Sequence, residues 1–477
     1  KEKYSERPNR YLMKHHYLSP KIIEKRINIT ENKKTLKEYL DDRLFVESWQ
    51  SAMIVTTFVQ FLHTVFGYKN RFLKKFHNII NSIVILDEVQ NIDPNYHRLI
   101  QKAFKVLGNV FNTYFLQITA TQPNMFDKTN LIEIVNSDYY MKNDVFNRVK
   151  LNINSKHQEL EDFANKFCDS FSDDNCLLVM NTKKFATNLF YKIQKNLTDY
   201  QHFCLTTNLT PFHRNKKIKE IRKLLDLHKK VIVVSTQLIE AGVDLSFKNV
   251  YRDFGPIDSI IQVAGRCNRS GELGILGGNF NLINLSNSRI YSKALIQYSE
   301  EILKNEKYSS IDFIALSEKY FNQFTFSLKS KMIIRAIKEM NYNRKVNNQI
   351  PVSDFKLIPD DPRKNIYILH TEEADKQMRE LIENKRKLKF VDNKKERNEI
   401  IIEIEKLKHK LIRFQISVYQ QELNVYNDLL EPENELAIDK NFTYIFISYD
   451  NQKEYVYDEN VGFLKEPKKN ISSTIMI

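Results

Sequence analysis

Two acidic residues that follow directly on a short apolar run are the first candidates for chemistry. Asp87 and Glu88 come after residues 83–86, Ile-Val-Ile-Leu, a run that is typical of a buried strand. In open α/β sheets ligands bind at the carboxyl ends of parallel strands, where this pair would lie. An Asp there can hold Mg²⁺, and the neighbouring Glu can polarise the water that attacks a γ-phosphate. A helix N-cap is the structural alternative, because acidic residues favour that position as well.

A second candidate group combines Gln262 with two arginines, Arg266 and Arg269. Arginines three residues apart on a helix are separated by about one turn, so we expect both guanidinium groups to point the same way. Such a pair suits a transferring phosphoryl group. A basic helix turn on the surface is the alternative. Upstream, Gly242 and Asp244 stand at a turn beyond an apolar run, which favours the phosphate interpretation.

The elements that must position these residues are short apolar runs separated by helical stretches. The runs that predict strands are residues 83–86, 114–118, 176–180 and 231–234. Each run is too short for a helix and nearly all apolar, as strands buried on both faces are. Helical patterns lie between them, for example over residues 163–171 and 182–195. The alternation predicts an α/β fold with a parallel sheet.

The α/β pattern divides the chain into three expected regions. Polar sequence ending near Arg148 interrupts the pattern, and strand signals fade after about Ser288. The expected regions are residues 1–148, 149–290 and 291–477. Within the last, residues 371–410 hold twelve Lys or Arg and ten Asp or Glu beside spaced apolar residues. That composition predicts one or two long amphipathic helices.

Composition limits the class of protein and of partner. Lys and Arg number 73 against 59 Asp and Glu in 477 residues, a formal charge of +14 that predicts an anionic partner, nucleic acid first. A Lys-rich proteome bias is the alternative. The four cysteines include no CxxC pair, which argues against a zinc ribbon or a disulfide framework and favours a reducing, cytoplasmic location. No stretch approaches the ~18 apolar residues of a membrane span, so we expect no membrane partner.

Adjacent histidines near the start are a weaker candidate, for a metal site. His15 and His16 would point to opposite faces of a strand and lie ~100° apart on a helix. Neither geometry pairs them on one ion. We therefore expect a solvated polar segment there.

Five segments in chain order resemble motifs II to VI of superfamily 2 helicases. They are DEVQ at 87–90, TAT at 119–121, LLVMNT at 177–182, VSTQLIEAGVDLSF at 234–247 and QVAGRCNRSGE at 262–272. The DEVQ form, IVTTFVQF at 54–61, TNLTPFHR at 207–214 and the long C-terminal part are similar to the CRISPR-associated helicase of type I interference systems. The resemblance is strong over about residues 50–290 and loose beyond.

The resemblance implies an α/β fold of two RecA-like lobes with parallel sheets, the first lobe incomplete, and a mainly helical C-terminal region. It also implies an ATP-dependent, Mg²⁺-requiring translocase on single-stranded DNA that moves 3′ to 5′. Enzymes of that family are recruited by a Cascade-type surveillance complex and unwind target DNA for degradation in antiviral defence.

The same resemblance assigns roles to residues of this sequence. The implied catalytic residues are Asp87, Glu88, Gln262, Arg266 and Arg269, with Asp87 at Mg²⁺, Glu88 at the hydrolytic water and the others at the triphosphate. The implied nucleotide-binding residues are Gly242, Asp244 and Gly265, with Asp244 bridging to the ribose or to a motif VI arginine. Thr119, Ala120 and Thr121 would couple nucleotide state to lobe movement.

Contacts to the DNA backbone are implied for small polar side chains at strand ends. The residues are Thr56, Thr57, Asn181, Thr182, Arg214, Ser235 and Thr236. Hydroxyl and amide groups suit phosphates because such contacts position a strand without reading its sequence. Ordinary turn or cap roles are the alternative for Thr56, Thr57 and Thr236.

Two departures from the family pattern bear on activity. The chain has no Gly-Lys dipeptide and therefore no GxxxxGK[ST] phosphate loop, and no His followed by Asp for the family's nuclease. We expect the C-terminal portion of a longer enzyme or one piece of a split one, which needs an N-terminal portion in cis or in trans. A truncated inactive product, a superfamily 2 helicase of repair or RNA processing, and a non-catalytic nucleic-acid-binding remnant that docks on a surveillance complex are the alternatives.

Overall fold

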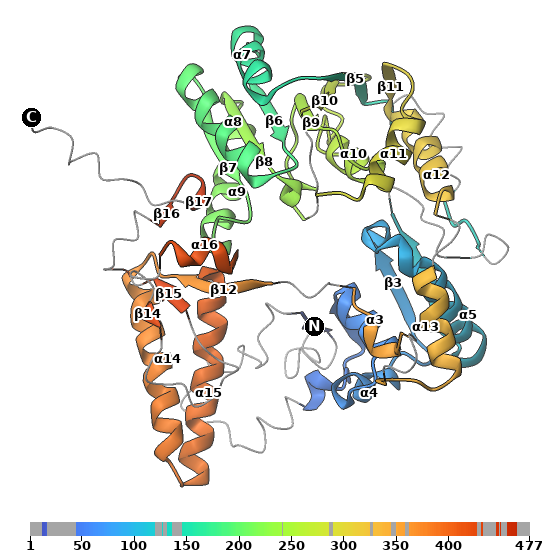
Figure 1. The fold of residues 1–477 in the computed structure, drawn as a ribbon, viewed down its shortest axis with the longest axis vertical. Coiled ribbons are helices and arrows are strands. Elements are labelled where there is room, and N and C mark those ends of the chain that lie inside the picture. The colour runs from blue at the N-terminus through green and yellow to red at the C-terminus, as the bar shows by residue number, and fades with distance from the viewer. Residues whose placement is uncertain are drawn as a thin grey trace, which may run out of the picture.

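The fold is that of a computed structural model, drawn in Figure 1. It describes residues 12–16, 44–119, 126, 131–135, 146–240, 242–285, 290–324, 328–344, 350–357, 362–426, 431–432, 445–447, 449 and 456–464.

The first lobe consists of two pairs of parallel strands with helices packed against them. The strands are β1 (Leu12–His15), β2 (Met53–Thr56), β3 (Ile83–Asp87) and β4 (Tyr114–Ile118), paired β1 with β2 and β3 with β4. The helices are α3 (Phe58–Phe66), α4 (Asn70–Phe76) and α5 (His97–Phe111), with the 3₁₀ turns η3 (Val89–Asn91) and η4 (Pro94–Tyr96). These elements share one apolar core, to which α5 contributes Leu99, Ile100, Phe104 and Leu107.

One face of the β3–β4 pair is apolar and open to solvent. Ile83, Ile85 and Tyr114 are 74%, 61% and 65% exposed, whereas Leu86 is buried. Successive side chains of a strand point to opposite faces, so only one face packs on the helices. The runs predicted strands buried on both faces, and for β3 and β4 that prediction is wrong. Exposed apolar area costs about 25 cal/mol per Å², so packing another segment on this face would be favourable.

The prediction of a solvated polar segment at the two histidines is also wrong for His15. His15 is the last residue of β1, and its Nδ1 accepts a hydrogen bond of 2.6 Å from the Trp49 indole. Trp49 is itself buried. The segment is therefore part of the packed first lobe.

The second lobe is a seven-stranded sheet in the order β11-β5-β10-β9-β6-β8-β7, shown across the top of Figure 1. Its strands are β5 (Val149–His157), β6 (Asn175–Val179), β7 (Gln201–Leu205), β8 (Val231–Ser235), β9 (Asn249–Asp253), β10 (Gly278–Asn284) and β11 (Lys307–Ser309). All pairings are parallel except that of β11 with β5. The interior strand β8, between β6 and the edge strand β7, is buried along its whole length, as the apolar run predicts.

The helices of the second lobe confirm the helical stretches predicted between the strands. They are α7 (Leu160–Ser170), α8 (Lys183–Asn196), α9 (Pro211–Asp226) and α10 (Ile257–Ala264), with the 3₁₀ turn η7 (Gln237–Ile239). Thr182 caps α8 by accepting a hydrogen bond of 3.0 Å from the Phe185 amide. Thr210 caps α9, whose first residue is Pro211, and proline suits that position because its fixed φ is helical.

After β10 the chain packs on the second lobe and then returns to the first. The elements are α11 (Lys293–Ile302), η8 (Ser310–Asp312), α12 (Phe313–Asn322), α13 (Leu328–Lys338) and η9 (Val352–Asp354). Helices α11 and α12 cover α10, and α13 lies against α5 (Figure 1). The return is held by the Tyr96 hydroxyl, which donates a hydrogen bond of 3.0 Å to the Lys356 carbonyl.

A third unit follows, formed by a small sheet and a long helical hairpin. Its sheet has the order β13-β12-β15-β14, from β12 (Arg363–Ile368), β13 (Gln415–Tyr419), β14 (Glu431–Pro432) and β15 (Ile445–Ile447). The hairpin of α14 (Glu372–Phe390) and α15 (Lys394–Leu411) confirms the predicted amphipathic helices (Figure 1). The remaining elements are η10 (Ile412–Phe414), α16 (Gln420–Asn424), β16 (Tyr457–Asp458) and β17 (Gly462–Phe463).

The third unit and the second lobe share one hydrophobic core. Ile366, Ile416 and Phe463 belong to the same buried cluster as Val233 of β8. Sequence after residue 290 therefore adds packing surfaces to both lobes as well as a third unit. No helix of the described residues is both long enough and apolar enough to span a bilayer.

Candidate functional site: two groups of motif residues, one on each lobe

The acidic turn of the first lobe is linked through Gln90 to the end of β4. Asp87 ends β3 with its side chain exposed, and Glu88 follows in the left-handed region at φ 56°. The Gln90 amide donates to the Glu88 carboxylate, and the Thr119 hydroxyl donates to the Gln90 side-chain oxygen. A continuous hydrogen-bonded chain thus joins the residues of the expected motifs II and III.

Gln90 is a site residue that the sequence analysis missed, although its position as the last letter of DEVQ was a usable signal. Its side chain is buried, so its amide is held in place by Glu88 and Thr119. The other two expected coupling residues, Ala120 and Thr121, lie outside the described residues.

The exposed carboxylate of Asp87 suits a hard cation. Mg²⁺ is bound through one or two carboxylates together with substrate phosphates and water rather than by an all-protein cage. Consistent with that mode, the described residues contain no group of three or more His, Cys, Asp or Glu side chains that could hold a metal ion. Asp87 beside Glu88 therefore fits Mg²⁺ only in the company of a phosphate ligand.

In the second lobe Asp244 and Arg269 form an ion pair. The Arg269 Nε lies 2.9 Å from Oδ1 of Asp244, and both side chains are partly exposed. Arg222 donates to the Asp244 carbonyl at 2.9 Å. Two residues before the aspartate, Gly242 adopts φ +72°, and a Cβ there would meet no atom within 4 Å. The turn thus presents open backbone beside the ion pair.

Arg266 is placed differently from Arg269, which corrects the expectation that the two guanidinium groups point the same way from one helix. Helix α10 ends at Ala264, so both arginines lie beyond it. Arg266 is buried and donates to the Ile239 carbonyl at 3.0 Å and the Glu240 carbonyl at 2.6 Å. Both arginines therefore bind the segment 239–244, Arg266 from inside and Arg269 from the surface.

The other two expected nucleotide-side residues lie on or at the end of α10. Gln262 is a half-buried residue of this helix. Gly265 is its C-cap at φ −63°, an ordinary helical value, and a Cβ there would lie 3.2 Å from the Gln262 carbonyl. The close neighbour of Gly265 is its own helix.

A buried arginine that the sequence analysis missed organises the ends of four elements. Arg252, on β9, is fully buried and donates to Asn181 after β6 and, at 2.9 Å each, to Ser259 on α10 and Tyr291 after β10. It also lies 3.5 Å from the Glu240 carboxylate. No spacing rule signals such a residue, because Arg inside a strand is usually an exposed position.

Glu240 has an unusual environment at this cluster. Burial raises the pKa of its carboxyl to about 7, opposed by the nearby Arg252 charge and by the Ser259 hydroxyl, which donates at 2.7 Å. Burial likewise raises the pKa of Asp258 to about 6. Removing water from a carboxylate is costly, so burial favours the protonated form of both Glu240 and Asp258.

The hydroxyl groups expected to contact DNA make local hydrogen bonds in this structure. Thr57 caps α3 by accepting from the Gln60 amide at 3.3 Å, and Thr182 caps α8 in the same way. Thr56 donates to the His15 carbonyl at 2.8 Å, and Ser235 to the Leu205 carbonyl at 2.9 Å. Their role at DNA stays a prediction.

Three further residues expected at DNA are buried to different degrees: Asn181 and Thr236 fully, and Arg214 in part. Asn181 is buried and donates to the Phe254 carbonyl at 2.7 Å, so it supports the Arg252 cluster. Thr236 is buried at the start of η7 with no side-chain cap bond. Burial lowers the pKa of the half-buried Arg214 on α9.

The segment around Arg214 is where the third unit attaches. The Phe463 amide donates to the Asn208 carbonyl at 3.0 Å, and the Thr210 amide to the Tyr457 hydroxyl at 3.1 Å. The imidazoles of His213 and His370 stack with centroids 3.9 Å apart. The segment that resembles the family at 207–214 therefore forms an interface with the β16–β17 hairpin.

The fold carries the ordered motif segments on two α/β lobes, the arrangement that the resemblance to superfamily 2 helicases predicts. Comparisons with known proteins agree. Residues 172–272 match a family model described as "CRISPR-associated nuclease/helicase Cas3, C-terminal". The predicted resemblance to the CRISPR-associated helicases is thereby confirmed over these residues, and the matched model describes the C-terminal part of those proteins.

Two curated relatives carry the description CRISPR-associated nuclease/helicase Cas3. The protein of Haloferax volcanii is 24% identical over 355 residues, covering 55% of this chain and 38% of its own. That of Methanothermobacter thermautotrophicus is 26% identical over 249 residues, covering 48% of this chain and 29% of its own. The chain thus spans well under half the length of either relative.

Among solved structures, a T. fusca Cas3–ATP crystal structure has a similar fold. It aligns with a TM-score of 0.60 and 13% identity, over 92% of this chain and 58% of the other. The similarity confirms the predicted α/β architecture of two RecA-like lobes.

Proposed function

We propose that this chain is the ATP-dependent single-stranded DNA translocase part of a type I CRISPR interference enzyme, which unwinds target DNA for degradation. The observation that carries the proposal is the convergence of the expected motifs V and VI. The Asp244–Arg269 pair and the two carbonyl contacts of Arg266 hold these segments together beyond the carboxyl end of β8. Such an arrangement gives one exposed guanidinium at the place where a triphosphate from the facing lobe is expected.

The residues of each lobe receive separate tasks in hydrolysis. Asp87 would hold Mg²⁺, which neutralises phosphate charge when bound, and Glu88 would orient the attacking water. From the second lobe, Gln262 and Arg269 would reach the triphosphate, with Gly242, Asp244 and Gly265 beside it. We assign Arg266 to positioning the Gly242 turn, because its guanidinium is committed to backbone carbonyls.

Movement would follow from the link between Glu88 and Thr119 through Gln90. A change at the water-orienting carboxylate is passed to the end of β4, which couples hydrolysis to closure and opening of the lobes. Single-stranded DNA would run across both lobes, near Thr56, Thr57, Thr182, Arg214, Ser235 and Thr236. The net charge of +14 supports a backbone-tracking contact of this kind.

The proposed partners are single-stranded DNA, a Cascade-type surveillance complex and an N-terminal portion that carries the phosphate loop and nuclease, joined in cis or supplied in trans. The cytoplasm is the proposed location. The open apolar face of β3 and β4 supports a further α/β segment, because a parallel sheet is normally covered on both faces.

The test is DNA-stimulated ATP hydrolysis with and without an N-terminal portion that carries a GxxxxGK[ST] loop. We expect the 477-residue chain alone to hydrolyse ATP poorly, because the loop amides and Lys normally hold the β- and γ-phosphates. Adding the N-terminal portion by fusion or in trans should restore hydrolysis. No hydrolysis after complementation would falsify the proposed translocase role, whereas robust ATPase activity of the chain alone would show that no N-terminal portion is needed.

A further inference from the structure

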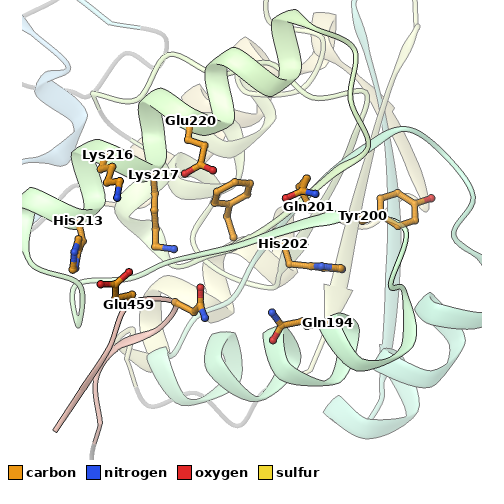
Figure 2. A pocket seen from close by; sticks show the side chains of 11 residues that line it. Gln194, Tyr200, Gln201, His202, His213, Lys216, Lys217, Glu220 and Glu459 are labelled. Atoms are coloured by element: carbon orange, nitrogen blue, oxygen red, sulfur yellow. The ribbon is translucent and has the colours of Figure 1, made fainter. Parts of the chain in front are cut away.

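A polar pocket of about 410 Å³ lies beside the edge strand β7, and its lining includes neither Asp244 nor Arg269. Figure 2 shows the side chains that line it. Its wall combines Lys216 and Lys217 of α9 with His202 and Phe203 of β7. The turn between β16 and β17 closes another side with Glu459 and Asn460. The pocket thus lies between the second lobe and the hairpin of the third unit.

Lys217 places an ammonium group in this pocket, where nearby carboxylates offset its burial only in part. Burial lowers its pKa, so water has been removed from the charge. Its Nζ lies 5.7 Å from the centre of the Phe203 ring, a weak cation–π contact. Among the described residues neither Lys216 nor Lys217 forms an ion pair with a carboxylate. Glu220, Glu459 and Asp458 favour the charged form but do not fully offset burial, so an anionic ligand would stabilise this cation further.

Other donors in the pocket point to the same class of ligand. Gln194, Gln201 and Asn460 bring side-chain amides that can donate hydrogen bonds to an anion. A metal cation is a poorer fit, because the described residues contain no group of three or more possible metal ligands.

We propose that this pocket binds a phosphate group through Lys216 and Lys217, and that the bound ligand fastens the β16–β17 hairpin to the second lobe. Lysine ammonium groups and amide donors are general phosphate ligands. Asn460 lies on the hairpin and the lysines on α9, so one ligand contacts both. The carboxylates of Glu220 and Glu459 at the same pocket oppose an anion and set its affinity. The inference is independent of the proposed helicase role, since binding needs no hydrolysis.

The experiment is a calorimetric titration of the full chain with inorganic pyrophosphate. Lys217→Met keeps the apolar stem and removes the charge, so we expect affinity to fall about tenfold or more. Lys219→Met is the matched control, because Lys219 is an exposed residue of the same helix that does not line the pocket. Glu459→Gln should strengthen binding. Equal affinity in the Lys217 and Lys219 variants, or weaker binding in the Glu459 variant, overturns the proposal.

Two further arms distinguish the source of the phosphate and guard against misfolding. If a short oligo-dT displaces pyrophosphate from the full chain and loses affinity in Lys217→Met, the ligand is a nucleic-acid backbone; if it does neither, the ligand is a free phosphate compound. If Lys217→Met has a lower melting temperature than the wild type, the titration is repeated with Lys216→Met, because Lys216 is exposed. Pyrophosphate should also slow hydrogen exchange over residues 456–464, and unchanged exchange there contradicts the fastening of the hairpin.

Discussion

Arg266 and Arg269 have the same side chain but different surroundings, and these predict opposite outcomes for the same substitution. Arg266 is buried with two carbonyl acceptors, whereas Arg269 is paired with Asp244 at the surface. Hydrogen bonds from a charged group are worth about 1.5–3 kcal/mol each, while exposed ion pairs contribute about 0–1 kcal/mol. Arg266 therefore acts mainly on stability and Arg269 mainly on the reaction.

We expect Arg266→Lys to lower the melting temperature, because one ammonium cannot reach both carbonyls with the geometry of the planar fork. Arg269→Lys should leave the melting temperature nearly unchanged and cut hydrolysis in the complemented enzyme by about 10³-fold. Melting temperature and turnover are to be measured on the same preparations. Normal turnover per folded molecule in Arg269→Lys would remove this residue from the active site.

Glu240 predicts a specific pH dependence of stability. Its pKa is about 7 in the folded protein, against an ordinary value of 4.5, because burial disfavours the charged form. Between these values the folded chain holds a proton that the unfolded chain has lost, so stability falls as pH rises from about 4.5 to 7. Each pKa unit corresponds to about 1.4 kcal/mol, which makes the loss about 3 kcal/mol.

Glu240→Gln should abolish that part of the pH dependence. Melting temperatures of the wild type and the variant, measured at pH 5 and pH 8, should shift relative to each other in favour of the variant at pH 8. Arg252, Ser259 and Asp258 surround the carboxyl and remain in both proteins, so the titration of Asp258 largely cancels. Parallel curves would mean that Glu240 is ionised throughout this range.

At the scale of residues, the sequence predicted types and order better than contacts. The acidic pair and the Gly242–Asp244 turn are recognisable because they follow apolar strands. The different placement of Arg266 and Arg269 was hidden, since it depends on α10 ending at Ala264, before either arginine. Arg252 was missed because its role comes from partners on distant elements, which no local pattern encodes.

Among the elements, the β16–β17 hairpin depends on one glycine. Gly462 has φ +88°, and a Cβ there would lie 2.3 Å from the Asn208 carbonyl carbon and oxygen. The Asn208 backbone cannot move away from such a Cβ as the end of a flexible side chain could. Substitution would lift the hairpin from the second lobe and expose Val461 and Phe463, which are buried in the lobe's cores.

We expect Gly462→Ala to lower the melting temperature markedly and to speed hydrogen exchange over residues 456–464. Gly274→Ala is the matched control, because Gly274 also has a positive φ, +72°, with no atom within 4 Å of a Cβ. Gly274→Ala should lower the free energy of unfolding only by the strain of an Ala in the left-handed region, about 1–2 kcal/mol. Similar small effects of both substitutions would show that the hairpin does not depend on this close approach.

Strand and helix positions followed from the apolar pattern, whereas their burial did not. The runs at 114–118 and 231–234 correspond to β4 and β8, but β8 is covered on both faces and β4 is not. An apolar run shows that a strand can be buried on both faces. Whether it is buried depends on other segments of the chain, or another chain, that pack on those faces.

For the whole molecule, the two lobes differ in completeness. The second lobe has a seven-stranded sheet and shares its core with the third unit. The described strands of the first lobe form two separate parallel pairs, although α13 returns to cover part of it. Two-stranded sheets are marginal in water, so the first lobe gains most from an added segment.

The last prediction tests whether the open face of β3 and β4 receives the N-terminal portion. Ile85→Lys places a charge on that face, where the side chain is 61% exposed, so the chain alone should keep its melting temperature. Complementation by the N-terminal portion should fail, because a lysine would be buried unpaired in the joined lobe. Val110→Lys, at a 70% exposed apolar residue of α5, is the control and should complement normally. Restored DNA-stimulated hydrolysis in Ile85→Lys would show that the N-terminal portion docks on another surface.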